Sequence, residues 1–269
     1  MPSLTTTDGA VVEEQSGSDG ILETRDLRRA FEGVSAVDGV TLSFAQGRLT
    51  GMIGPNGAGK STILSLLTGT VVPTGGQVLY RGEDITALPP FQRARAGIMR
   101  TFQLASEFKR LTVLENLLSS APRHPGDSLA GALLARKRWR RREEELVEEA
   151  LALLDRFRLA RHADDYAGEL SGGQRRLVEI MRALMARPTV LLLDEPMAGV
   201  HPRLAEEIGT HLEALRDEGM TIIMVEHELG SVERLCDPVI VMATGRVLAQ
   251  STMSELRQRQ DVLEAYLVG

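Results

Sequence analysis

The sequence predicts an α/β fold in which a predominantly parallel sheet is flanked by helices. Three observations indicate this class. A short apolar strand, 48–53, leads into a glycine-rich loop and then into a helix. Two further apolar runs, 190–194 and 221–225, each end next to acidic residues. Continuous short apolar runs of this kind are typical of strands that are buried on both faces of a parallel sheet.

The glycine-rich loop fits the phosphate-binding pattern G-x-x-x-x-G-K-[ST] at every defined position. Its residues are Gly54, Pro55, Asn56, Gly57, Ala58, Gly59, Lys60 and Ser61. Glycines let backbone N–H groups turn onto phosphate oxygens, and the helix that follows adds the positive end of its dipole. Lys60 can reach the β- and γ-phosphates, and the Ser61 hydroxyl can ligate Mg²⁺. The strand and helix on either side argue against a chance match.

Composition and charge limit the function. The chain has 269 residues, 43% of them hydrophobic, which suits one large domain or a domain with a subdomain. Its net charge of −6 gives no global electrostatic case for nucleic-acid binding. No apolar run is long enough to span a membrane, and the N-terminus has no signal-peptide pattern. Cys236 is the single cysteine, so we expect no internal disulfide and interpret it as a small buried hydrophobe.

The segment before the loop predicts a pair of strands. Residues 1–20 lack apolar periodicity and read as a disordered tail. Strands at about 22–31 and 36–44 are joined by a turn at Glu32 and Gly33. Phe31, at the end of the first strand, could stack on a base. On spacing alone, however, an ordinary core phenylalanine is the favoured interpretation.

The middle of the chain is mostly helical. A strand at 77–81 and a helix at about 90–96 precede a strand, 97–103, that ends at Gln103. A capping box from Thr112 to Glu115 opens a helix to about Ser120, and a connector, 121–127, leads to a long helix over 129–157. Six basic residues in the run 136–142 are followed at once by glutamates. We favour a solvated helix face with i,i+4 ion pairs over a patch for lipid headgroups or an anionic partner.

Polar residues gather at two further places. Ser171 is predicted to cap a helix that extends to Ala186, and Ser-Gly-Gly before a helix is a second possible phosphate site. Asp194 ends an apolar strand, where it could hold the Mg²⁺ shell, and Glu195 could orient and deprotonate a water. His227 follows the strand 221–225 and could contact a γ-phosphate, although a lone histidine is more often structural. The other four histidines, which have no such context, are His124, His162, His201 and His211.

The C-terminal part completes the pattern. A helix over 202–218 has Pro202 in its first turn, where proline is well tolerated. Strands at 238–243 and 246–250 and two short helices, about 253–259 and 261–267, follow.

In this order the elements resemble the ATP-binding cassette ATPases over about residues 21–269. The resemblance rests on Phe31, the loop 54–61, Gln103, the signature Leu170 to Gln174, the acids Asp194 and Glu195, the turn 197–201, and His227. It implies a P-loop NTPase core over 21–90 and 188–269, with an N-terminal antiparallel β subdomain. It also implies an α-helical subdomain, about 91–187, that carries the signature.

The resemblance implies how the residues act. Two cassettes pair head to tail, so that each ATP lies between the loop of one and the signature of the other. Glu195 polarises the attacking water, His227 braces it together with the γ-phosphate, and Lys60 and Gln103 assist. The residues that the resemblance assigns to Mg²⁺ binding are Ser61, Gln103 and Asp194. ATP contacts fall to Phe31, which stacks on adenine, and to Gly54, Pro55, Asn56, Gly57, Ala58, Gly59, Lys60, Ser61, Thr62, Ser171, Gly172, Gly173 and Gln174.

Within the family the chain is most similar to the branched-chain amino-acid importer group. The matching segments are 100–103, 111–116, 195–199, 225–227 and 262–267. That resemblance implies a peripheral ATPase at the cytoplasmic face of the cell membrane. Its partners would be two integral-membrane permease subunits, a second ATPase subunit, identical or different, and an extracytoplasmic solute-binding protein. Two departures from the family pattern are His201, where Asn or Asp is usual, and Met181, where a small residue is common.

Other functions stay open at this point. Urea or short-amide importers and the lipopolysaccharide-export ATPase are related. A soluble cassette ATPase acting on nucleic acid or ribosomes usually carries two cassettes or a very long coiled coil, and neither is present here. A non-enzymatic nucleotide-binding regulator is disfavoured because Lys60, Glu195 and His227 are all present.

Overall fold

The computed structural model describes residues 20–101, 108–121 and 136–267. The expected tail up to residue 19, Gln103, most of the connector 121–127, and the expected beginning of the long helix lie outside these residues.

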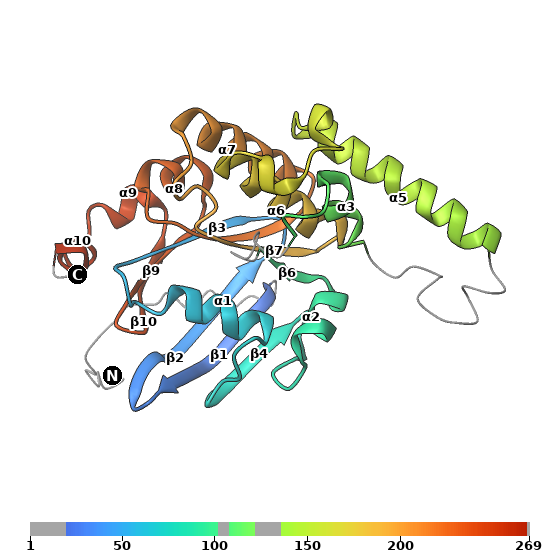
Figure 1. Ribbon diagram of the computed structural model, residues 1–269. Coiled ribbons are helices and arrows are strands. Elements are labelled where there is room, and N and C mark those ends of the chain that lie inside the picture. The colour runs from blue at the N-terminus through green and yellow to red at the C-terminus, as the bar shows by residue number, and fades with distance from the viewer. Residues whose placement is uncertain (1–19, 102–107, 122–135, 268–269) are drawn as a thin grey trace, which may run out of the picture.

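Strands and helices alternate along most of the chain (Figure 1). In chain order they are β1 (Gly20–Phe31), β2 (Val34–Ala45), β3 (Leu49–Ile53), α1 (Lys60–Thr68), β4 (Gly75–Tyr80), β5 (Glu83–Asp84), α2 (Pro90–Ala96), β6 (Ile98–Arg100), α3 (Val113–Leu118), α5 (Arg136–Arg156), α6 (Gly172–Met185), β7 (Val190–Asp194), α7 (Pro202–Asp217), β8 (Thr221–Val225), α8 (Leu229–Leu235), β9 (Val239–Ala243), β10 (Arg246–Ser251), α9 (Met253–Leu256) and α10 (Gln260–Leu267). Two 3₁₀ turns, η2 (Ala160–His162) and η3 (Ala167–Glu169), precede α6.

Within the described residues, the strands form two sheets. One has six strands in the order β10-β9-β3-β8-β7-β6, and all its neighbours are parallel except β9 and β10. The other has four antiparallel strands in the order β2-β1-β4-β5. The α/β class and the N-terminal antiparallel sheet are therefore confirmed. Since β3, β8, β7 and β6 run in parallel, the segments that follow them meet at one edge of the sheet.

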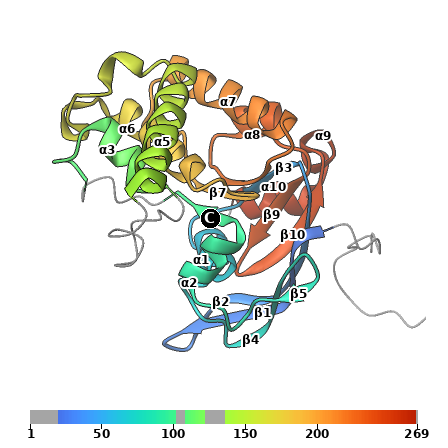
Figure 2. The ribbon, with the colours of Figure 1, turned by 90° about the vertical axis from the view of Figure 1, so that its right-hand side faces the viewer.

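The six-stranded sheet is covered on both faces, as its apolar strands predict. On β7, Leu191 and Leu193 pack with α5, α6 and α7 on one face. Val190 and Leu192 face the other way and pack with α1 and the antiparallel sheet. Figures 1 and 2 show the resulting layers, with α6, α7 and α8 on one side and α1 with β1, β2 and β4 on the other. In Figure 1, α5 extends away from these layers.

Helices that have a conventional N-cap residue begin where the sequence predicts. The remaining differences between the prediction and the structure are local. Thr112 and Ser171 each form a complete capping box. The helix α8 was not predicted, because its cap is Glu228, whose carboxylate accepts from Ser231 N, and glutamate is not among the residues preferred at this position. The strand β6 ends at Arg100, and the last two residues of the expected strand 97–103 lie outside the described residues.

A fully buried arginine joins α1 to α2. The Arg93 guanidinium donates to Leu66 O at 2.7 Å and Leu67 O at 3.0 Å at the end of α1. It also donates to Leu88 O at 3.0 Å and Thr86 O at 2.8 Å. These carbonyls satisfy a charge that would otherwise be costly to bury. These hydrogen bonds fix α1, the helix that follows the phosphate-binding loop, to the segment that leads into β6.

His211 on α7 makes stability depend on pH. Its ring stacks on Phe157 with 4.2 Å between ring centroids, and its Nε2 is buried without a partner among the described residues. Burial lowers the pKa of His211, opposed by the charge of Glu207 and assisted by the charges of Arg156 and Arg158. The unfolded chain therefore binds more protons than the native chain just below the ordinary histidine pKa of about 6.5.

We expect the free energy of unfolding to fall as pH drops below about 6.5, down to the lowered pKa of His211. His211→Phe keeps the stack on Phe157 and removes the titration. Urea midpoints at pH 7.5 and 5.5, measured on both proteins without nucleotide, test this. The variant should lose less stability on acidification than the wild type, and equal losses would contradict the assignment.

Candidate nucleotide-binding site

The loop after β3 is shaped by glycines in the left-handed region. Gly59 has φ 97°, and a β-carbon there would lie 2.3 Å from Ala36 O on β2. Gly54 has φ 148°, and a β-carbon there would lie 2.1 Å from Met242 O on β9. Both positions therefore need glycine for conformation and for space. The loop is wedged between the two sheets at the edge where β3 ends.

Lys60 is held inside this loop. Its Nζ donates to Gly54 O at 2.7 Å and Pro55 O at 2.9 Å, and the side chain is buried. Burial lowers the pKa of Lys60, while the charges of Glu195 and Asp194 act in the opposite direction. The ammonium group is thus held in the loop by two of the loop's own carbonyl groups.

Asp194 joins three elements. Its Oδ1 accepts from Ser61 Oγ on α1 at 3.2 Å, and its Oδ2 accepts from Arg100 on β6 at 2.6 Å. Arg100 also donates to Ser65 Oγ on α1 at 2.8 Å. The pair is largely buried, with side-chain exposures of 15% for Arg100 and 8% for Asp194. A hydroxyl and a carboxylate in contact form an oxygen donor set that fits Mg²⁺, which commonly takes one or two protein ligands beside phosphates and water.

Glu195 and His227 form the second pair at this edge. His227 Nε2 lies 2.8 Å from Glu195 Oε1, although the residues are far apart in sequence. Glu195 has φ 48°, an unusual conformation for a non-glycine residue, and its N–H donates to Val225 O at 2.9 Å. Glu195 follows β7 and His227 follows β8, and these strands are parallel neighbours. Sheet topology therefore brings together the two residues that the family resemblance assigns to the attacking water.

A buried carboxylate supports this pair. Glu226 Oε1 accepts from Met197 N at 2.8 Å, and Oε2 accepts from His227 N at 3.2 Å. Burial raises the pKa of Glu226, opposed by these two backbone hydrogen bonds. Glu226 thus ties the turn after Glu195 to the backbone of His227. The sequence reasoning missed this role, although Glu226 stands in the quoted segment 225–227.

The predicted signature forms a separate cluster at the start of α6. Ser171 Oγ accepts from Gln174 N at 3.3 Å, and Gln174 Oε1 accepts from Ser171 N at 2.9 Å. A β-carbon at Gly173 would lie 2.2 Å from Leu204 Cδ2, whereas Gly172 has open space. No hydrogen bond in the described part of the chain joins residues 171–174 to the loop 54–61.

Arg176 connects the signature helix to Glu195. It donates to Glu179 Oε2 at 2.8 Å and to the backbone carbonyl of Glu195 at 3.1 Å. Beside it lies a hollow of about 250 Å³ between the start of α6 and the turn after Glu195, lined by Gly172, Arg175, Arg176, Glu179, Ala198, Gly199 and Val200. Sequence reasoning missed Arg176, because its contact with Glu195 crosses between two elements.

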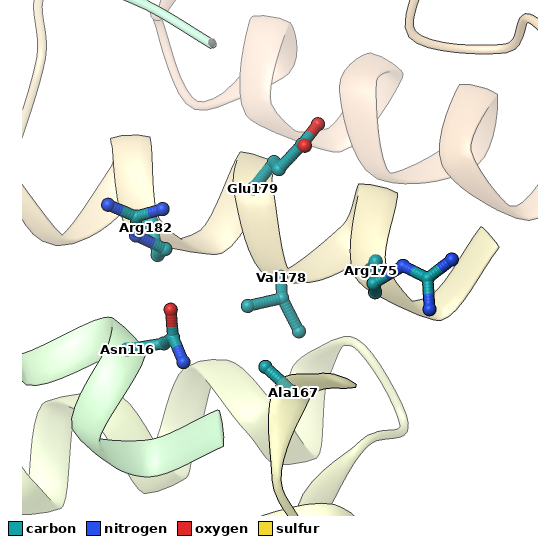
Figure 3. Close-up of a pocket in the computed structure, with 6 residues that line it drawn as sticks. All are labelled: Asn116, Ala167, Arg175, Val178, Glu179 and Arg182. Atoms are coloured by element: carbon teal, nitrogen blue, oxygen red, sulfur yellow. The ribbon is translucent and has the colours of Figure 1, made fainter. Parts of the chain in front are cut away.

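A second, much smaller cavity lies farther along α6. Figure 3 shows Val178 of α6 pointing between Asn116 of α3 and Ala167. The cavity volume of about 10 Å³ is barely enough for one water. On the same helix, the Arg182 guanidinium lies over the Phe108 ring, 4.1 Å from its centroid.

Two remaining expectations concern exposed side chains. Phe31 is 41% exposed, with the Arg29 guanidinium 4.5 Å from its ring centroid, so it is not the ordinary core phenylalanine that spacing alone favoured.

In the basic run, Arg141 and Arg142 pair with Glu145 at 3.2 and 3.4 Å, as expected for a solvated helix face.

No helix in residues 20–101, 108–121 or 136–267 is both long and apolar enough to cross a membrane.

Comparison with known proteins identifies the family. Residues 37–198 match the family described as ABC transporter. The high-affinity branched-chain amino acid transport ATP-binding protein BraF of Pseudomonas aeruginosa is 40% identical over 248 residues, which cover 92% of this chain and 97% of BraF. The protein of the same description named LivG, from Escherichia coli K12, is 37% identical, with coverage of 93% and 98%.

Solved structures agree with the fold. A nucleotide-free ATP-binding cassette from an ABC transporter matches with a TM-score of 0.80 and 40% identity, covering 91% of this chain and 98% of that one. A dimeric bacterial ABC transporter cassette matches with a TM-score of 0.73 and 25% identity, covering 86% and 98%. With the loop, the strand-end acids and the signature in place, the chain belongs to the ABC transporter family, as an ATP-binding ATPase component of a transporter.

Proposed function

We propose that this ATPase energises the import of branched-chain amino acids. The observation that carries the proposal is the convergence, at one sheet edge, of buried Lys60, the Ser61–Asp194 contact and the Glu195–His227 pair. The substrate class comes from the relatives named for branched-chain amino acid transport. Urea or short-amide import and lipopolysaccharide export are less favoured on the same ground.

We assign the chemistry to the chain's own residues. Lys60 and the loop N–H groups neutralise the phosphates, and Phe31 stacks on adenine. Glu195 accepts a hydrogen bond from the attacking water and takes up its proton, while His227 keeps Glu195 in position through the 2.8 Å contact. Ser61, Asp194 and Gln103 would hold Mg²⁺, which would supply charge neutralisation at the transferred phosphate.

The assembly is part of the same proposal. Ser171, Gly172, Gly173 and Gln174 serve the ATP of a second cassette, since they form a cluster separate from the loop. The ATP-binding core comprises 21–90 and 188–269. The helical subdomain, about 91–187, receives one of the two membrane-embedded permease subunits at the cytoplasmic face of the cell membrane, and a solute-binding protein acts through the permeases from the other side.

The test is purification of the intact membrane complex with its solute-binding protein, reconstituted in vesicles. We expect leucine, isoleucine or valine to stimulate ATP hydrolysis several-fold, and urea or lipopolysaccharide to have no effect. Lys60→Ala, which removes the buried ammonium group, is the control and should abolish both basal and stimulated turnover. Stimulation by urea or by lipopolysaccharide, with none by the amino acids, would overturn the proposed substrate.

A further inference from the structure

The imidazole of His162, away from the sheet edge, makes three side-chain contacts. His162 ends η2, shortly before the signature. Its Nε2 lies 3.1 Å from Arg161 Nε and 3.1 Å from Gln174 Nε2. Its Nδ1 lies 2.6 Å from Asp165 Oδ2. The ring therefore connects a carboxylate, a guanidinium and the last residue of the signature.

These contacts fix the tautomer of His162. The arginine Nε–H can only donate, so Nε2 of His162 must accept. The ring proton then resides on Nδ1, where it donates to the Asp165 carboxylate. A second donor, the Gln174 amino group, shares the Nε2 lone pair. The Nδ1–H tautomer accommodates all three contacts, with the two donors sharing the single Nε2 lone pair.

The tautomer in turn fixes the Gln174 amide. With its amino group directed at His162, its Oε1 faces Ser171 N, from which it accepts at 2.9 Å. If the amide turned over, Oε1 would face the Nε2 lone pair and the amino group would face an N–H donor. Both contacts would then be repulsive.

The orientation of the Gln174 amide also affects the hydrogen bonds of the Ser171 hydroxyl. Because Oε1 holds the Ser171 backbone, Ser171 Oγ accepts from Gln174 N at 3.3 Å. Accepting uses a lone pair of Oγ and leaves its hydroxyl proton free. That proton can donate to a phosphate oxygen at the start of α6, where N–H groups already favour an anion.

We propose that His162 is a positioning residue for the signature, holding Gln174 and hence Ser171 in the orientation that binds the phosphate of the second cassette's ATP. The inference rests on the proposed function of residues 171–174. It predicts an effect on the assembly of the ATP site between cassettes and little effect on the loop 54–61 of the same chain.

Two substitutions test the proposal. His162→Leu removes the acceptor, whereas His162→Gln keeps an oxygen acceptor and an N–H donor on a side chain of similar reach. In the purified transporter complex, we expect His162→Leu to raise the KM for ATP about tenfold, the free-energy equivalent of one lost hydrogen bond. The kcat should change far less. The KM of His162→Gln should stay within about threefold of the wild-type value, which corresponds to a free-energy loss of roughly half that of one hydrogen bond.

A tautomer measurement is independent of activity. Imidazole ¹⁵N shifts of the full chain, assigned by comparison with His162→Gln, should show the Nδ1–H form. The Nε2–H form would overturn the proposal, as would equal KM values for His162→Leu and wild type, or equal losses in both variants. A wild-type complex that hydrolyses no ATP would instead overturn the proposed function.

Discussion

We expect Glu195→Gln to bind ATP and to hydrolyse it at least about a hundred times more slowly than the wild type, a loss typical for removal of a general base. The amide has nearly the same shape as the carboxylate, so the loop and Lys60 keep their contacts with each other. It cannot take up a proton from water at neutral pH. ATP therefore stays intact between paired cassettes, and the pair does not relax.

Three measurements check this expectation: phosphate release, the affinity for ATP, and the mass of the protein with and without ATP. We expect phosphate release to be nearly lost, ATP affinity to be retained, and the dimer to accumulate with ATP. Glu233→Gln is a matched control, because Glu233 makes the same kind of exposed carboxylate contact, 2.6 Å to Arg257, away from the sheet edge. Turnover of Glu195→Gln close to that of Glu233→Gln would remove Glu195 from the role of base.

The sequence predicts best those features whose cause is local. The loop 54–61, the capping box at Thr112 and the helix cap at Ser171 depend on residues a few positions apart, and the structure has them where expected. The strand-end position of Asp194 and Glu195 also followed from the pattern, since such a continuous apolar run is typical of a strand that a parallel sheet buries on both faces.

The side-chain partners at the sheet edge could not be predicted in the same way. The contact between Glu195 and His227 requires that β7 and β8 be neighbours, and strand order is not encoded in any single motif. The Arg100–Asp194 ion pair requires in addition that β6 be the edge strand beside β7. His162 had no periodic or motif context at all, because its partners come from a turn and from a separate helix.

Replacement of Gly59 by alanine should be among the most damaging single changes in the loop, and Gly57 provides its control. Both glycines have positive φ, 97° and 80°, so alanine at either is strained by about 1–2 kcal/mol. A β-carbon at Gly57 meets no atom within 4 Å, whereas one at Gly59 would lie 2.3 Å from Ala36 O. The neighbour is backbone of β2 and cannot turn aside as a flexible side chain would.

We therefore expect Gly57→Ala to lower the free energy of unfolding by about 1–2 kcal/mol and Gly59→Ala by several kcal/mol, measured by urea unfolding without nucleotide. Without nucleotide, no bound phosphate contributes to either value, and the difference between the variants reports the clash with β2 alone. If Gly59→Ala relieves the clash by moving the loop, Lys60 moves with it, and ATP affinity should fall at least about tenfold, as for one lost charged hydrogen bond. Equal stability of the two variants, with ATP affinity unchanged in Gly59→Ala, would contradict the close approach of the loop to β2. That approach makes the position of the ATP-binding loop depend on the antiparallel sheet as well as on the motif's own residues.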